Sequence, residues 1–95
     1  MFLHLGKDLV IPLKDIIAIV DADSLGSQDT RDFFKIAEEE GFIYNIVNDN
    51  IKSYIITERI EKDKNTGEKI RKSIIYCSNI SSTTLYKRAN FMKKI

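Results

Sequence analysis

Two strand-like stretches, residues 52–60 and 70–78, place the strongest restriction on how this chain can fold. Both contain three Ile and a Tyr, residue types that favour a pleated, half-buried strand. The connection between them, residues 61–69, is highly charged and contains Asn65-Thr66-Gly67, a combination typical of an exposed turn. The sequence therefore predicts a β-hairpin in the C-terminal half, with its charged tip in solvent.

Shorter apolar runs near the N-terminus predict three small strands, at residues 2–5, 9–13 and 16–20. Gly6-Lys7-Asp8 resembles a turn that closes a hairpin between the first two. Pro12 has no N–H to donate to a ladder, so it should lie at a strand edge or end. The third run is continuously apolar, which predicts a strand buried on both faces, either inside the domain or partly in a subunit contact.

A helix is predicted over residues 27–40. Ser27 or Asp29 can cap its first turn, and Gly41 is a typical C-terminal stop. The apolar residues of this segment provide an inner face, made of Phe33, Phe34 and Ala37.

A second helix is predicted over residues 82–93, because Ser81 or Ser82 can cap its first turn. Leu85 and Ala89 then recur at helical spacing and must pack against another element. Its cations, Lys87 and Arg88 among them, fall outside that apolar stripe. They either meet an anionic partner or form a solvated helix face.

The strand over residues 42–47 follows the first helix, and Asn48-Asp49-Asn50 after it is a strong turn signal. A second hairpin is therefore predicted between residues 42–47 and 52–60. With 95 residues, the chain can bury one modest core. We predict a single α+β domain over residues 1–95, with about six short, mostly antiparallel strands and two helices.

Charge is unevenly distributed along the chain, although the net charge is only +1. Residues 1–50 hold four Lys or Arg against ten acidic residues, and residues 51–95 hold eleven against four. This polarity favours head-to-tail self-association or an anionic partner at the basic end, unless folding mixes the two halves.

Cys77 is the single cysteine, so an internal disulfide is excluded and a reducing compartment is indicated. The chain begins without a basic segment followed by a long apolar run, and no window approaches the length of a membrane span. A soluble, cytoplasmic protein without a membrane partner is predicted.

Enzymatic motifs are weak. Asp21 and Asp23 follow the apolar run at 16–20, as in phosphatases of the haloacid-dehalogenase type, but no later acidic pair for magnesium accompanies them. An Asx-type turn leading into the helix is the simpler interpretation. His4 is the only histidine and has no companion ligands for zinc. We predict no enzyme activity, no catalytic or metal-binding residues, no cofactor and no small-molecule substrate.

Five segments in order resemble the RemA/RemB family of extracellular-matrix regulatory proteins. The most specific is the C-terminal pattern Ile80-Ser81-Ser82-Thr83-Thr84-Leu85-Tyr86-Lys87-Arg88-Ala89. The others are residues 2–6, 14–19, 30–34 and 52–57, so the resemblance spans nearly the whole chain. It implies a small α+β subunit that assembles into a closed ring and, for part of the family, a DNA-binding regulator of biofilm-matrix operons.

The resemblance also implies where DNA would bind. Family arginines in the loop after the first helix correspond here to residues 48–52, and a further cation corresponds to Lys14. Of the loop, only Lys52 is positively charged, because Asp49 and Asn50 stand where arginines are expected. Charge and helix geometry add Lys87 and Arg88 as candidate phosphate contacts.

The leading hypothesis is a non-enzymatic, self-assembling regulator of matrix gene expression that binds duplex DNA through cations repeated around a homo-oligomer. Its candidate residues are Lys14, Lys52, Lys87 and Arg88. A second hypothesis is an oligomeric protein-interaction module that does not touch DNA. A small phosphatase using Asp21 and Asp23 is a distant third.

Overall fold

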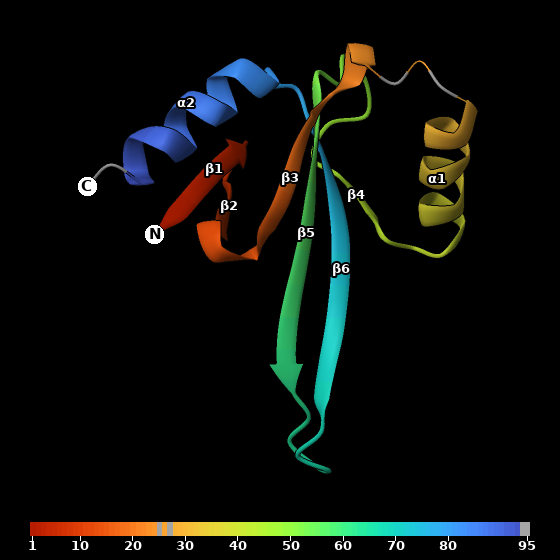
Figure 1. The fold of residues 1–95 in the computed structure, drawn as a ribbon, viewed down its shortest axis with the longest axis vertical. Coiled ribbons are helices and arrows are strands. Elements are labelled where there is room, and N and C mark those ends of the chain that lie inside the picture. The colour runs from red at the N-terminus through yellow and green to blue at the C-terminus, as the bar shows by residue number, and fades with distance from the viewer. Residues whose placement is uncertain (25, 27, 94–95) are drawn as a thin grey trace.

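The computed structural model describes residues 1–24, 26 and 28–93. Six strands fall into two sheets, and two α-helices lie on opposite sides of the larger one (Figure 1), so the predicted α+β class is confirmed. The strands of the small sheet, β1 (Phe2–Gly6) and β2 (Leu9–Pro12), pair antiparallel as the first predicted hairpin. Pro12 is the last residue of β2, where its missing N–H leaves no gap in the ladder.

The larger sheet has the strand order β3-β5-β6-β4. Its centre is the predicted long hairpin, formed by β5 (Ser53–Lys62) and β6 (Lys69–Ser78), which pair in register from Ser53 with Ser78 to Lys62 with Lys69. Gly67 sits at φ 75° in the turn, a conformation that glycine adopts without strain.

Apolar residues from both sheets and from α2 (Ser82–Lys93) form one core. Its fully or nearly fully buried members are Leu3, Leu5, Ile11, Ile19, Ile46, Ile55 and Leu85. Ser78 ties the two sheets together, because its hydroxyl donates to the Leu5 carbonyl at 2.5 Å and accepts the Ile80 N–H at 3.0 Å.

The hairpin predicted between residues 42–47 and 52–60 is wrong. The strand after the first helix is short, β4 (Ile43–Asn45), and it pairs with β6 in parallel, with Ile43 opposite Ile75. Its expected partner β5 already has β3 on that edge, so β4 takes the free edge of β6. The chain then crosses the end of the sheet through residues 46–52 to enter β5 (Figure 1).

The third strand, β3 (Ile16–Asp21), pairs only with β5 and is an edge strand. A register shift lies between Ile16 and Ala18, and the Ile17 between them is 60% exposed. Within the subunit, therefore, the prediction of burial on both faces is wrong. The Tyr86 hydroxyl donates to the Ile19 carbonyl at 2.6 Å, so α2 occupies part of the open edge.

Both predicted helices form, as α1 (Gln28–Glu39) and α2. Asp29 lies inside α1 rather than at its cap, and the other predicted cap, Ser27, lies outside the described residues. Gly41, at φ 78°, follows α1 as predicted. Ser81 caps α2, accepting the Thr84 N–H on its Oγ at 3.2 Å, so of the two predicted serines it is Ser81 that holds the cap.

Candidate nucleic-acid interface

The Asp21 turn is a structural feature of the end of β3. The Asp21 carboxylate accepts the Asp23 N–H at 2.9 Å, and the Asp21 carbonyl accepts the Ser24 hydroxyl at 2.7 Å. This is the predicted Asx-type turn. Across the described part of the chain, no group of three or more His, Cys, Asp or Glu side chains is arranged to hold a metal ion. His4 has an exposed side chain on β1, and its Nε2 contacts the Lys7 carbonyl at 2.5 Å.

Lys52 directly precedes β5, at the end of the sheet where β3 and β6 end. Its N–H donates to the Ser78 carbonyl at 2.8 Å and its carbonyl accepts the Ala22 N–H at 3.0 Å, so its backbone is fixed to the ends of β6 and β3. Its side chain is exposed, beside Asn50 and Asn79 on the wall of a shallow hollow. The loop thus holds Lys52 firmly and presents it to solvent.

Lys14 is exposed in a 3-10 turn, Leu13–Asp15, just before β3. Because β3 and β5 are antiparallel, Lys14 and Lys52 flank opposite ends of β3. Six residues at about 3.3 Å each place their backbones about 20 Å apart. The two family-guided cations therefore do not form one patch within a subunit.

Lys87 and Arg88 lie on α2, and both are exposed. Arg88 donates from one guanidinium nitrogen to the His4 carbonyl at 3.3 Å, which leaves its remaining donors available for a ligand. A cleft of 290 Å³ between β3 and α2 has Leu13, next to Lys14, on one wall and Ala89, next to Arg88, on the other. The structure therefore brings the backbone at Lys14 close to α2, and leaves Lys52 at the other end of β3.

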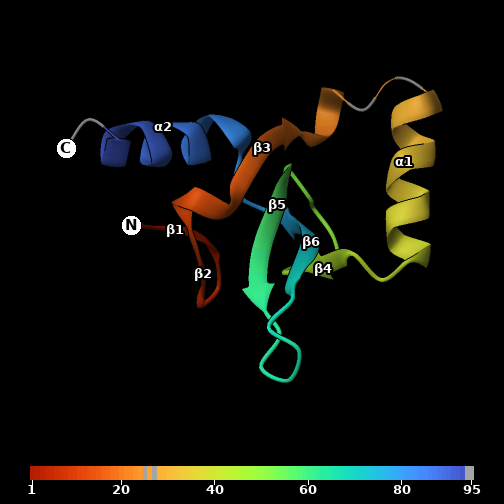
Figure 2. The ribbon, with the colours of Figure 1, turned by 60° about the horizontal axis from the view of Figure 1, so that its bottom comes forward.

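The helix α1 stands to one side of the sheet (Figures 1 and 2), and its packing differs from the prediction. Phe34 packs on Tyr54, with ring centroids 4.5 Å apart, and Ala37 is 4% exposed. Phe33, predicted on the inner face, is instead half exposed, because one helical position turns its side chain about 100° away from that of Phe34.

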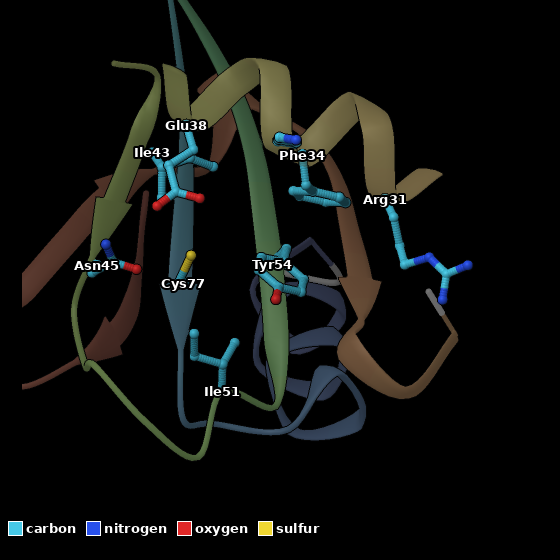
Figure 3. A pocket seen from close by; sticks show the side chains of 9 residues that line it. Arg31, Phe34, Glu38, Ile43, Asn45, Ile51, Tyr54 and Cys77 are labelled. Carbon is cyan, nitrogen blue, oxygen red and sulfur yellow. The ribbon is translucent and has the colours of Figure 1, made fainter. Parts of the chain in front are cut away.

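Between α1 and the sheet lies an open cleft of 420 Å³ (Figure 3). Tyr54 and Cys77 of the sheet line one side of the cleft, and Arg31, Phe34, Lys35 and Glu38 of α1 line the other. Burial, and to a smaller extent the nearby Glu38 carboxylate, raises the pKa of the Cys77 thiol to about 11. Burial likewise raises the pKa of Tyr54. The thiol is therefore protonated at neutral pH and is a poor nucleophile.

Sequence reasoning missed the apolar side chains that the folded subunit leaves in solvent. Ile17, Ile36 and Ile60 are each about 60% exposed, on β3, α1 and β5 respectively. The only sequence signal was helical spacing: Ile36 lies three residues after Phe33, on the side of α1 away from Phe34. Phe33 and Ile36, one helical turn apart, form a small exposed apolar surface on α1.

Fold and surface together define a small α+β domain whose described part offers exposed cations and exposed apolar side chains. The sequence matches the family described as RemA-like, extracellular matrix regulatory protein A-like, over residues 2–89, and the chain belongs to that family. It is also 33% identical to extracellular matrix regulatory protein B of Bacillus subtilis (strain 168), over 100% of this chain and 98% of that protein.

These matches confirm the predicted resemblance to the family. The names of the family and of the relative describe regulatory proteins of the extracellular matrix. None of the described helices has the length and hydropathy needed to cross a membrane.

Proposed function

We propose that this protein is a cytoplasmic, non-enzymatic regulator of extracellular-matrix gene expression that assembles into a ring-like homo-oligomer and binds duplex DNA. The full-length match to a matrix regulatory protein carries the proposal. The geometry supplies two supporting observations, which are a set of exposed cations and a set of exposed apolar side chains.

The DNA-binding part rests on Lys14, Lys52, Lys87 and Arg88. All four are exposed, and the backbone around Lys52 is held by two hydrogen bonds at the sheet end. A single subunit offers few phosphate contacts, and its net charge of +1 gives weak attraction to DNA. Repetition of these cations around an oligomer adds contacts on one duplex and raises affinity through multivalency.

The assembly part rests on apolar surface. Ile17 on the β3 edge and Phe33 and Ile36 on α1 are more than half exposed, which is costly for a free monomer. Burying them between subunits removes this cost. It would also satisfy the part of the sequence prediction that placed residues 16–20 partly in a subunit contact.

Gel shift on duplex DNA, with a salt titration, tests the DNA-binding part. At about 50 mM salt we expect the wild type to bind, and the triple variant Lys52→Ala, Lys87→Ala, Arg88→Ala to bind at least about tenfold more weakly, because it lacks three phosphate contacts. For the same reason the affinity of the variant should depend less steeply on salt concentration. The matched control removes three exposed cations elsewhere, Lys7→Ala, Lys35→Ala and Lys64→Ala, and should bind nearly as the wild type does. Equal binding by the two triple variants would refute the assigned contacts.

The alternative function is an oligomeric protein-interaction module that does not bind DNA. One observation favours it: Asp49 and Asn50 precede Lys52 in an exposed loop, so the loop carries an acid next to its single cation. Absence of any wild-type shift near 50 mM salt, in a sample that is oligomeric by sedimentation, would select this alternative. A monomer at micromolar concentration would contradict the assembly that both hypotheses share.

A further inference from the structure

The end of the long hairpin projects from the sheet as a two-stranded arm, residues 58–73. Pairing between β3 and β5 ends at Thr57, and pairing between β4 and β6 starts at Ile75. Both edges of the arm are therefore unpaired within the subunit, and the arm extends away from the rest of the molecule (Figures 1 and 2). Isolated two-stranded ribbons are marginally stable in water, so a projecting arm gains stability from contact with a further surface.

One face of the arm has an apolar centre framed by cations. Ile60 is 60% exposed and lies directly opposite Arg71 in the ladder. Lys62 follows it on the same face and pairs with Lys69. The one acid on this face, Glu58, is held by Arg71 at 2.6 Å. We name Ile60, Lys62, Lys69 and Arg71 the basic patch.

The outer side of α1 carries the opposite arrangement. Ile36 is 58% exposed, and its neighbours three and four positions away on the helix are Phe33 and three acids, Asp32, Glu39 and Glu40. Glu40 continues the helical ladder, since its N–H donates to the Ile36 carbonyl at 2.9 Å. All five side chains are exposed, and we name them the acidic patch.

We propose that the basic patch of one copy docks on the acidic patch of a second copy of this chain. Ile60 of one copy meets Phe33 and Ile36 of the other. Around them Lys62 and Lys69, together with Arg71, which also holds Glu58, face three carboxylates. Within one subunit the two patches lie apart, because the arm points away from α1 (Figure 1), so the contact forms between copies. The inference rests on the self-assembly proposed above and specifies its geometry.

Such a contact is heterologous, because each copy offers a different surface to each of its two neighbours. A contact of this type generates a ring when the rotation between copies closes, and a filament when it does not. The contact also accounts for the uneven distribution of charge along the chain, since the acidic patch comes from the N-terminal half and the basic patch from the C-terminal half.

Charge reversal in two separate variants tests the contact. The arm variant carries Lys62→Glu and Lys69→Glu, and the helix variant carries Glu39→Lys and Glu40→Lys. Each variant alone should assemble only at a subunit concentration at least about tenfold above that of the wild type, because like charges then face each other. Mixed in equal amounts, the two should regain assembly, since each arm now finds a helix of opposite charge. Sedimentation gives the mass of each sample.

The control reverses two exposed cations outside the basic patch, Lys7→Glu and Lys64→Glu, and should assemble as the wild type does. Recovery on mixing cannot arise from misfolded variants, and circular dichroism of each variant checks folding separately. If the wild type assembles and either variant does so equally well, or if the mixture stays monomeric, the proposed contact is wrong while self-assembly stands. A monomeric wild type would overturn both.

Discussion

Cys77 shows how a single residue connects the core to the cleft under α1. Its side chain is 2% exposed on β6, and burial first, then the Glu38 carboxylate, raises the pKa of the thiol to about 11 from an ordinary value of 9.0. The folded protein therefore favours the protonated thiol more than the unfolded chain does. This contribution to stability is complete below pH 9 and is lost as the pH rises toward 11.

We expect the free energy of unfolding to fall by up to about 2 kcal/mol between pH 9 and pH 11, beyond the loss seen in a Cys77→Ala variant over the same range. Urea unfolding at several pH values measures how the free energy of unfolding of each protein changes with pH. Burial raises the pKa of Tyr54 in both proteins, whereas the smaller effect of Cys77 on the pKa of Tyr54 is lost in the variant, so the difference between the two proteins reports the thiol together with its effect on Tyr54. If the free energy of unfolding changes with pH equally in the two proteins, the thiol has the same pKa in the folded and the unfolded protein.

At the scale of elements, two of the three predicted hairpins, the end of α1 and the start of α2 were predictable because their signals are local. Gly41 and Gly67 stand at the positive φ values that end α1 and close the long hairpin, and Ser81 caps α2. The position of β4 was not predictable in this way. It depends on Ile43 meeting Ile75, more than 30 positions away, and on β3 having already occupied the competing edge of β5.

Replacing Ser81 by Ala should destabilise the protein by about 1 kcal/mol, because the Thr84 N–H then loses its partner at the start of α2. The matched control is Thr83→Ala, an exposed position in the first turn that makes no capping bond, and it should change stability by less than about 0.5 kcal/mol. Chemical unfolding followed by circular dichroism compares the two. Equal losses for the two variants would exclude a role for the cap.

For the candidate site, too, the sequence identified the residues, whereas their positions relative to one another depend on the fold. Charge and helical spacing identified Lys87 and Arg88 as exposed cations, and the family resemblance added Lys14 and Lys52. Their mutual placement needed the fold, because Lys14 and Lys52 flank opposite ends of β3. The exposure of Phe33 and Ile36 also needed the fold, since spacing alone does not tell which side of α1 faces the sheet.

For the whole molecule, charge in the loop at residues 46–52 should control affinity for DNA. In the proposed regulator, Asp49→Arg places a cation near Lys52 and should strengthen binding at low salt at least about fivefold, with a steeper salt dependence. Asn50 is left unchanged, because at φ 54° it holds a conformation that Asn tolerates better than Arg. The control Asp8→Arg makes the same change in charge in the exposed turn between β1 and β2.

Filter binding across a salt series measures both variants. A gain confined to Asp49→Arg would support DNA contact at this loop, because the control changes net charge equally. Equal gains for the two variants would mean that the loop has no special position relative to the DNA.

The parallel pairing of β4 with β6 also determines when β4 can join the sheet during synthesis. Ile43–Asn45 pairs with residues 75–77, which are made later. At a translation rate of about 5 to 20 residues per second, β4 waits roughly 2 to 6 s for its partner, with α1 already made. Throughout that interval Phe34 and Ala37 of α1 lack the sheet against which they pack in the folded protein, and stay exposed. The ribosome-bound intermediate is thus the stage at which this protein most needs protection from aggregation.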